Sequence, residues 1–209
     1  MDKSGGVENL NDVEKQRKLK NKERYKKIEV KIRGLTPLLM NKLNIESLKS
    51  KSRMRMETYD PEVEAEKSAY IAEINGKRQL YIPCEAVYSM TINTAKQYRI
   101  RRMSLASLLA GTMRIEPEKI PLGTDKYEID LRAVVIQKQR VLKARAKVPE
   151  WEATFYIIYD SERLPEGIHE TLKTILEDAG TRMGLLDYRP QHKGWFGTFA
   201  VKSFKLLED

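Results

Sequence analysis

The chain has 209 residues, of which 41% are hydrophobic, which is enough for one domain of ordinary size with a packed core. Its single cysteine, Cys84, excludes an internal disulfide framework and a cysteine-based zinc site. No run approaches the ~18 apolar residues of a membrane-spanning helix, and Met1 to Val7 lacks a signal-like apolar core, so we expect a cytoplasmic protein without a membrane partner. The net charge of +9 favours polyanions, of which nucleic acid is the commonest inside cells.

Residues 1–27 are predicted to form a basic, flexible arm ahead of a single domain that spans residues 28–209. The stretch from Lys15 to Lys27 is dense in lysine and arginine, and Leu19 is almost its only apolar residue. Such a segment repels itself and buries too little surface to offset the entropy of ordering. A solubilising tail is the alternative interpretation.

The domain is predicted to open with a strand and a basic loop. Ile28, Val30 and Ile32 alternate with charged residues, which is the period of a half-buried strand. Residues 40–60 are polar, and we expect a flexible loop or an extended hairpin there. Cations stand at every second position of part of this segment: Lys49, Lys51, Arg53 and Arg55.

Two short helices, a hairpin and a longer helix follow. Asp60 and Pro61 predict a helix that runs to Lys67, and Asn75-Gly76 predicts a turn between strands at 70–74 and 79–82. Apolar residues at helical spacing predict a helix over residues 85–98. A second short helix over 105–110 is predicted to end at Gly111.

The remaining elements complete an α+β pattern. Strands are predicted at 127–136, 140–147 and 151–159, a helix at 168–179 and a last strand at 197–206. Without the small hairpin, the order is strand, helix, strand, strand, helix, strand. This order predicts a ferredoxin-like, RRM-type antiparallel sheet backed by two helices, with inserted hairpins and loops. One face of that sheet would stay free to bind a ligand.

The strands around residue 140 are predicted to carry a cationic stripe. No carboxylate lies between Asp130 and Glu150, so the stripe would track phosphates. Lys138 and Arg140 stand at even positions, whereas Lys143, Arg145 and Lys147 stand at odd positions. Successive residues of a strand point to opposite faces, so all five cations can share one face only if a bulge intervenes at Val141-Leu142. A charged edge that blocks aggregation is the alternative. The cations are Lys138, Arg140, Lys143, Arg145 and Lys147.

A second candidate contact is the glycine-aromatic segment 187–197. Its glycines let a backbone approach closely, so that peptide N–H groups can meet phosphate oxygens, and its aromatic rings are available for base stacking. A tight turn with Trp195 and Phe196 in the core is the alternative, and at least one of the two is expected to be core. The candidate binding residues are Tyr188, Arg189, His192, Lys193, Gly194 and Trp195.

A third, weaker candidate lies at a predicted exposed helix end. Cations are favoured there by the helix dipole whatever the function. The residues are Arg99, Arg101 and Arg102.

Catalytic signals are sparse, and we expect no cofactor, no metal and no enzymatic activity. The sequence lacks a Walker-type loop, a GxSxG motif and a metal-ligand spacing of cysteine or histidine. Asp130, Asp160 and Asp187 could bind a divalent ion only if folding gathers them. A loop histidine, His192, could serve as a general base, whereas His169 reads as a surface residue.

Three motifs resemble the RAMP superfamily, the ferredoxin-like RNA-binding subunits of CRISPR effector complexes. They are Leu80-Tyr81-Ile82-Pro83-Cys84-Glu85-Ala86 leading into a helix, Gly194 and Gly197 before the last strand, and Gly34-Leu35-Thr36-Pro37-Leu38-Leu39-Met40 after the first strand. The resemblance spans roughly residues 28–206, is strongest to the backbone subunit that polymerises along guide RNA, and extends to small phage and mobile-element proteins. It implies the fold and a single-stranded ligand. Some related subunits cut RNA with a first-loop aspartate, but Gly34 to Met40 contains no acid, so that activity is not implied.

The combined hypothesis is a non-catalytic protein that binds single-stranded RNA or DNA, with self-assembly or other subunits of a CRISPR-like or phage nucleoprotein complex as further partners. Lys138, Arg140, Lys143 and Arg145 would track phosphates, the Arg189–Gly197 loop would clamp the backbone, and Tyr188 or Trp195 would stack a base. The basic arm and the Lys49–Arg55 loop would add affinity. A metal-independent endoribonuclease that uses His192, and an assembly protein that binds an acidic partner, are the alternatives.

Overall fold

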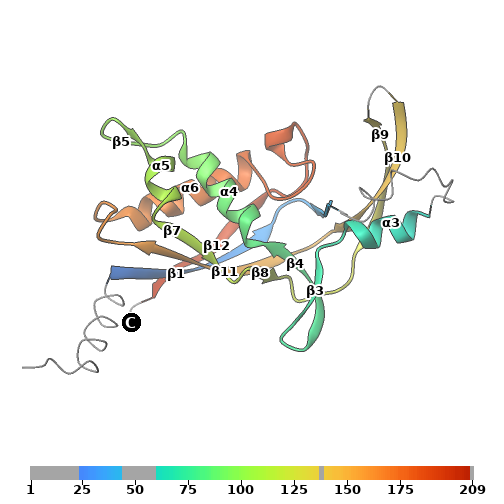
Figure 1. Cartoon of the computed structure of the whole chain (residues 1–209), viewed down its shortest axis with the longest axis horizontal. Coiled ribbons are helices and arrows are strands. Elements are labelled where there is room, and N and C mark those ends of the chain that lie inside the picture. The colour runs from blue at the N-terminus through green and yellow to red at the C-terminus, as the bar shows by residue number, and fades with distance from the viewer. Residues whose placement is uncertain (1–23, 44–59, 137–138, 208–209) are drawn as a thin grey trace, which may run out of the picture.

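The centre of the structure is a four-stranded antiparallel sheet in the order β12-β1-β11-β7 (Figure 1). The structure is a computed structural model that describes residues 24–43, 60–136 and 139–207. Its central strands are β1 (Tyr25–Gly34), β7 (Met113–Glu116), β11 (Glu152–Asp160) and β12 (Phe199–Leu207). β1 begins at Tyr25, so residues 25–27 belong to the sheet and not to the arm, whose residues 1–23 lie outside the described part.

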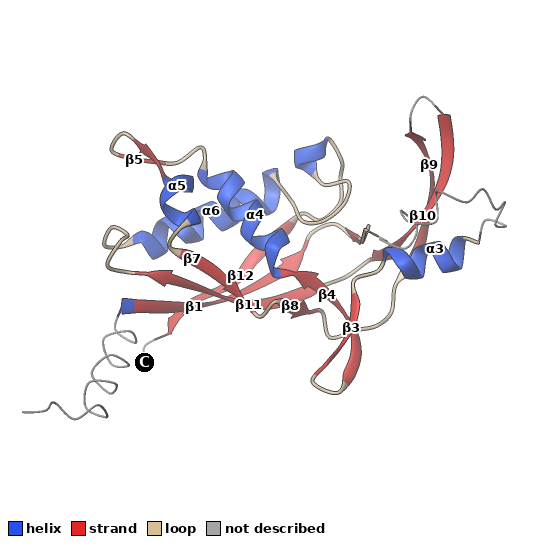
Figure 2. Ribbon diagram, viewed as in Figure 1, coloured by secondary structure: helices blue, strands red, loops and turns tan. Residues whose placement is uncertain are grey.

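Three helices cover one face of this sheet (Figure 2). They are α4 (Cys84–Ala95), α5 (Leu105–Ala110) and α6 (Ile168–Arg182). The alternating apolar residues of β1 are fully buried and meet Phe155 and Ile157 of β11 in the core. Gly180 lets α6 lie directly on β12, because a Cβ there would come within 2.3 Å of the Phe199 carbonyl oxygen.

The predicted strands at 127–136 and 140–147 exist, but they do not belong to the central sheet. They form β9 (Glu128–Ile136) and β10 (Gln139–Val148), which pair with each other and with β2 (Leu38–Leu39) in a separate three-stranded sheet. The place in the central sheet is taken by β7, for which we expected no strand. β7 has only four residues, so its alternation of buried and exposed side chains is too short to predict a strand without knowledge of its partner β11.

Smaller elements surround this core. α3 (Pro61–Ser68) begins as predicted, since the Asp60 carboxylate accepts the Glu62 N–H at 2.9 Å. It packs on β10, where the Ser68 hydroxyl accepts the Ala146 N–H at 2.8 Å. The predicted Asn75-Gly76 turn joins β3 (Ile71–Ile74) to β4 (Lys77–Pro83), which also pairs with β8 (Lys119–Pro121).

The helix predicted at 85–98 ends earlier, at Ala95, and a small hairpin follows it. This hairpin pairs β5 (Arg99–Ile100) with β6 (Met103–Ser104). A short 3-10 helix, η1 (Pro190–His192), lies between α6 and β12. Within the described ranges, none of the helices combines the length and apolar character that a membrane crossing demands.

Candidate nucleic-acid interface

The segment between α6 and β12, residues 184–198 (the glycine loop), is fixed by its own backbone and by the first loop of the chain. The Leu185 N–H donates to the Gly197 carbonyl and the Phe196 N–H to the Tyr188 carbonyl, at 2.9 and 3.1 Å. The Gly197 N–H donates to the Pro37 carbonyl at 2.9 Å. The glycine loop is therefore a rigid platform, and two of the three sequence motifs that suggested the RAMP resemblance lie against each other.

Two glycines of this loop are required by close contacts and not by exposure to a ligand. A Cβ at Gly194 would lie 1.8 Å from the Tyr188 carbonyl oxygen, and one at Gly197 would lie 2.0 Å from that of Leu185. The Gly194 N–H donates to the Arg189 carbonyl at 3.0 Å and the Gly197 N–H to the Pro37 carbonyl, so both groups already have partners within the protein. These two glycines therefore make the loop compact, and their own N–H groups are not available to phosphate; that other peptide N–H groups of the segment meet phosphate oxygens stays a prediction.

The aromatic residues of the loop divide between core and surface. Phe196 is 2% exposed and belongs to the core, whereas Trp195 is 61% exposed and Tyr188 is 44% exposed. The centroids of the Trp195 and Tyr188 rings lie 5.6 and 6.1 Å from that of Phe196. Phe196 thus supports two rings that are accessible to solvent, and such rings suit base stacking.

Arg189, predicted to bind phosphate, holds the loop together instead. Its Nε and Nη2 atoms donate to the Gln191 Oε1 atom at 3.0 and 2.9 Å, and Nη1 donates to the Leu186 carbonyl. Burial lowers the pKa of Arg189, although nearby Asp187 opposes that shift. Arg189 is therefore a positioning residue.

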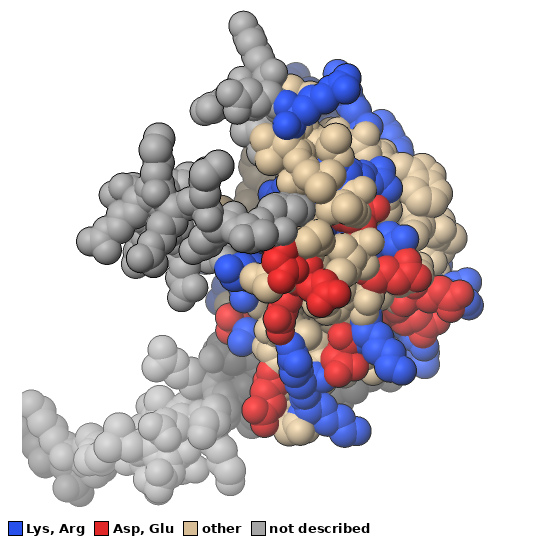
Figure 3. Space-filling model, turned by 90° about the vertical axis from the view of Figure 1, so that its right-hand side faces the viewer, with Lys and Arg blue, Asp and Glu red and all other residues tan. Residues whose placement is uncertain are grey.

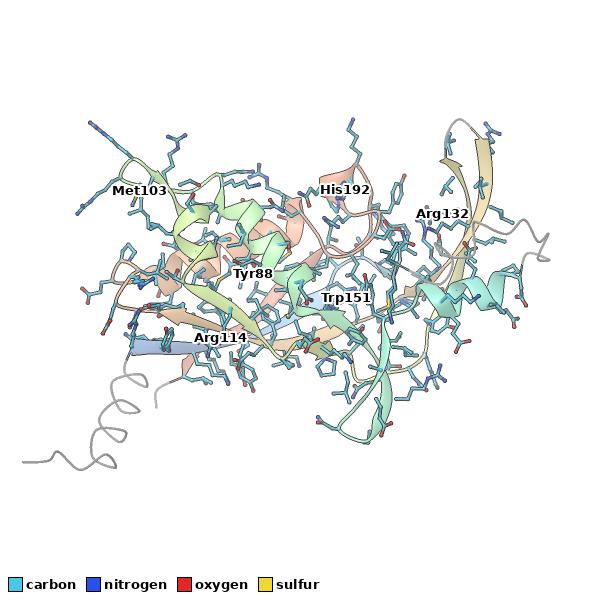
Figure 4. The ribbon with its side chains drawn as sticks, viewed as in Figure 1. Tyr88, Met103, Arg114, Arg132, Trp151 and His192 are labelled. Atoms are coloured by element: carbon cyan, nitrogen blue, oxygen red, sulfur yellow. The ribbon has the colours of Figure 1, made fainter. Side chains whose placement is uncertain are left out.

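His192 stands at the outer end of the loop (Figure 4), and Lys193 follows it at the end of η1. Both are exposed, and Lys193 adopts a left-handed backbone with φ of 61°. Across the described parts of the chain, the His192 side chain has no hydrogen-bond or ion-pair partner that would orient it as a base. Lys193 provides a cation beside the exposed rings.

The cationic hairpin has an unbroken register. β10 pairs with β9 from Gln139 to Lys147 without a shift, so the bulge at Val141-Leu142 that a single cationic face would need is absent from the ladder. Arg140 consequently lies on the opposite face from Lys143, Arg145 and Lys147. Four further predicted contacts lie outside the described residues: Lys51, Arg53, Arg55 and Lys138.

Carboxylates accompany most of the cations on the polar face of the hairpin. Lys147 Nζ lies 2.7 Å from a Glu128 oxygen, and Arg145 Nη1 lies 3.1 Å from Asp187 Oδ2. The expectation of an acid-free stripe is wrong, because the acids come from the paired strand and from the glycine loop. This end of the molecule shows Asp and Glu gathered between Lys and Arg side chains (Figure 3).

The hairpin and the glycine loop nevertheless meet. Arg132 of β9 places its guanidinium carbon 4.9 Å from the centroid of the Phe196 ring, and Arg145 of β10 reaches Asp187 in the loop. Arg132 also pairs with Asp130, at 2.7 Å. The exposed rings of the loop and the polar face of the hairpin therefore form one surface, which we call the loop–hairpin surface.

A hollow of about 430 Å³ lies beside this surface, between the loop and the first turn of α4. Of the lining residues, the sequence analysis proposed only Arg189 for binding, although the Ile82-Pro83 entry into α4 marks the position of the others. The helix dipole places partial positive charge there. Its lining is Tyr70, Pro83, Glu85, Ala86, Ser89, Gly184, Leu186 and Arg189.

The third predicted cation group lies elsewhere. Arg99, Arg101 and Arg102 are on the β5–β6 hairpin and not at a helix end, because α4 stops at Ala95. This hairpin lies at the opposite end of the molecule from β9 and β10 (Figure 1). All three side chains are exposed, but folding does not bring them to the loop–hairpin surface.

The three aspartates considered for a divalent ion are not gathered. Asp130 pairs with Arg132 and Asp187 with Arg145, while Asp160 accepts hydrogen bonds from Arg24 at the start of β1. The Arg24 hydrogen bond lowers the pKa of Asp160, which is a structural role for that carboxylate. In the described ranges, no cluster of His, Cys, Asp or Glu side chains is suited to a metal.

The sequence matches no protein-family model and no curated protein sequence. Its fold is similar to that of a chain in the cryo-EM structure of the type III-B Cmr-β bound to cognate target RNA, with a TM-score of 0.55 and 11% identity over 95% of this chain. The chain spans 66% of that neighbour's length. A CRISPR RNA-guided surveillance complex gives a TM-score of 0.41 and 10% identity, over 83% of this chain and 66% of the other.

These observations define a mixed α/β protein whose fold is similar to that of a chain in the RNA-bound Cmr-β complex. The fold relationship that the sequence motifs indicated is confirmed at this level.

Proposed function

We propose that this chain binds single-stranded nucleic acid, RNA in particular, through the loop–hairpin surface and does not cleave it. The observation that carries the proposal is the rigid loop that holds Trp195 and Tyr188 open to solvent beside exposed Lys193 and next to the cationic hairpin. Single strands expose base faces that stack on such rings, while cations meet the phosphates. The fold neighbour comes from a complex that is bound to target RNA, which supports the same ligand.

The proposal includes a ferredoxin-like core of RAMP type. The chain order β1, α4, β7, β11, α6, β12 and the antiparallel sheet order β12-β1-β11-β7 support this arrangement. The β9–β10 hairpin, α3 and the β3–β4 hairpin would then be insertions. The glycine loop would lie at the entrance to the last core strand.

Within this surface, the residues have different roles. Trp195 and Tyr188 stack bases, and Lys193 and Lys143 contact phosphates. Arg145 positions the hairpin against the loop through Asp187. Arg140, on the other hairpin face, contacts only nucleic acid that passes around the hairpin.

Assembly along the strand is part of the proposal, since the fold neighbour belongs to an RNA-bound multi-subunit complex. Cleavage of RNA is not part of the proposal, because the His192 side chain lacks an orienting partner in the described structure. Incubating labelled RNA in EDTA tests this point: intact RNA with the wild-type chain is the expected result. Cleavage that is lost in His192→Ala would establish the ribonuclease instead.

The binding itself is tested by fluorescence anisotropy with labelled single-stranded RNA, single-stranded DNA and duplex of matched sequence. We expect single strands to bind more tightly than duplex, with a log–log salt slope of about −0.7 per neutralised phosphate. Failure of every oligonucleotide to bind would overturn the proposal. Binding with no salt dependence would remove its electrostatic part.

A further inference from the structure

The face of the central sheet that is turned away from the helices carries two tyrosines. The apolar residues of β1 point to the helices, so the alternate residues Tyr25 and Lys27 point to the other face. Tyr156 of β11 and Arg114 of β7 share this face, since the register pairs Lys27 with Ile158 and Ile158 with Arg114. We call this the open sheet face.

Both tyrosine rings are covered by cations and not by the core. Lys27 Nζ lies 4.2 Å from the centroid of the half-buried Tyr156 ring, and the Lys27 side chain is itself 41% exposed. Within the described ranges, its nearest carboxylate oxygen, on Glu116, is 3.9 Å away, which is too far for a hydrogen bond. Lys27 is therefore a flexible cover that can leave the ring when another planar group arrives.

The second ring has the same kind of neighbours. Tyr25 is 36% exposed, and the guanidinium carbons of Arg24 and Arg114 lie 5.5 and 5.6 Å from its centroid. Arg114 is 58% exposed and pairs with Glu116 at 3.1 Å. Surface pairs of this kind are weak and exchange readily with other anions.

Among the described residues of this face, cations outnumber acids. Glu152 is surrounded by Lys31, Arg33 and Lys202, which together lower its pKa. A single carboxylate cannot neutralise three cations, so positive charge remains. Asp160 is opposite Tyr25 in the register, so it also points to this face, where it is paired with Arg24. Among the described residues, the cations of the face are Arg24, Lys27, Lys31, Arg33, Arg114, Lys202 and Lys205, and its acids are Glu29, Glu116, Glu152 and Asp160.

We infer that the open sheet face is a second binding surface for single-stranded nucleic acid, on which bases stack on Tyr156 and Tyr25 and phosphates meet Lys27 and Arg114. Rings on neighbouring strands of one sheet face, with cations around them, provide the two contacts that an unpaired strand offers. Lys27 moves from the ring to a phosphate when a base takes its place. The inference rests on the proposed function only for the class of ligand, because this surface is separate from the loop–hairpin surface.

The test measures where RNA contacts the full-length chain and how tightly it binds. With single-stranded RNA that contains 4-thiouridine, photo-crosslinking and mass spectrometry should find adducts on the peptides of Tyr25 or Tyr156. In anisotropy measurements, Tyr156→Leu should weaken binding about fivefold or more, whereas Tyr156→Phe, which keeps the ring, should bind as the wild type does. Thermal unfolding of each variant checks that the sheet is intact.

Arg114→Gln has a matched control in Arg78→Gln, because both arginines are exposed and each pairs with one glutamate. Arg114→Gln should weaken binding and Arg78→Gln should not. Unchanged affinity in folded Tyr156→Leu, with adducts only on the glycine loop, would overturn the inference and leave the proposed function standing. Loss of binding in Tyr156→Leu but not in Trp195→Leu would support the open sheet face and remove the loop–hairpin proposal.

Discussion

The glycine loop and the β9–β10 hairpin touch each other, yet their polar groups are used differently. In the hairpin, Arg145 and Lys147 are paired with carboxylates, so much of its charge is already compensated. In the loop, Trp195 is exposed and Lys193 stands at the surface beside it. The difference shows that a cation-rich stretch of sequence need not be the part with the most available binding groups.

The largest expected effect comes from breaking the loop itself. Gly194→Ala places a Cβ 1.8 Å from the Tyr188 carbonyl oxygen, so the loop must open or shift. We expect the free energy of unfolding to fall by about 3 kcal/mol and RNA binding to be lost. Gly111→Ala is the control, because a Cβ there meets no atom within 4 Å. Equal melting temperatures for the two variants would refute the rigid-loop description.

The link between the two regions is tested by Asp187→Asn. The Arg145 side chain is only 12% exposed, and the substitution leaves its guanidinium without the carboxylate opposite it. We expect a loss of about 1–3 kcal/mol in unfolding free energy, measured by urea denaturation. Glu66→Gln, which breaks the exposed pair with Arg78, should cost under about 1 kcal/mol. Equal losses of unfolding free energy in Asp187→Asn and Glu66→Gln would show that the contact between Arg145 and Asp187 does not hold the hairpin against the loop.

Trp195→Leu separates binding from stability. Trp195 is 61% exposed, so the free energy of unfolding should change by no more than about 0.5 kcal/mol. Loss of base stacking should weaken single-stranded RNA binding by about 1–3 kcal/mol in an anisotropy titration. Met103→Ala, at an exposed apolar position of the β5–β6 hairpin, should leave affinity unchanged. An unaltered affinity in Trp195→Leu would exclude stacking at this ring.

The smallest effect compares Lys193, for which the described residues provide no carboxylate partner, with Lys147, which is paired. Lys193→Gln should reduce the log–log salt slope of binding by about 0.7, the contribution of one phosphate contact. Lys147→Gln should change the slope less, because Lys147 is paired with Glu128 at 2.7 Å. A larger change of the salt slope for Lys147→Gln than for Lys193→Gln would mean that the hairpin, and not the loop, makes the main phosphate contacts.

The sequence predicted the locally encoded parts of the fold. The alternation of Ile28, Val30 and Ile32 identified β1, the Asp60 cap identified the start of α3, and Asn75-Gly76 identified a hairpin turn. These features depend on residues close together in the chain. They could therefore be read without knowledge of the tertiary structure.

Features that depend on distant pairing were missed or misplaced. The short strand β7 is defined by its pairing with β11. The strands β9 and β10 were assigned to the central sheet because the periodicity of a strand does not indicate which strand it pairs with. The carboxylates opposite Arg145 and Lys147 come from another strand and from the loop. The predicted contact between loop and hairpin is thus present in the structure, but the charge available on it was overstated, and its role in binding stays a prediction.

The most direct test of the central claim compares two sets of substitutions in one RNA-binding assay. One variant carries Trp195→Leu with Lys193→Gln, and the other carries Arg99→Gln, Arg101→Gln and Arg102→Gln at the far end of the molecule. We predict that the first loses about tenfold or more in affinity for single-stranded RNA, although it removes fewer charges, and that the second changes by about threefold or less. A greater loss in the arginine variant would show that total charge, and not the loop–hairpin surface, governs binding.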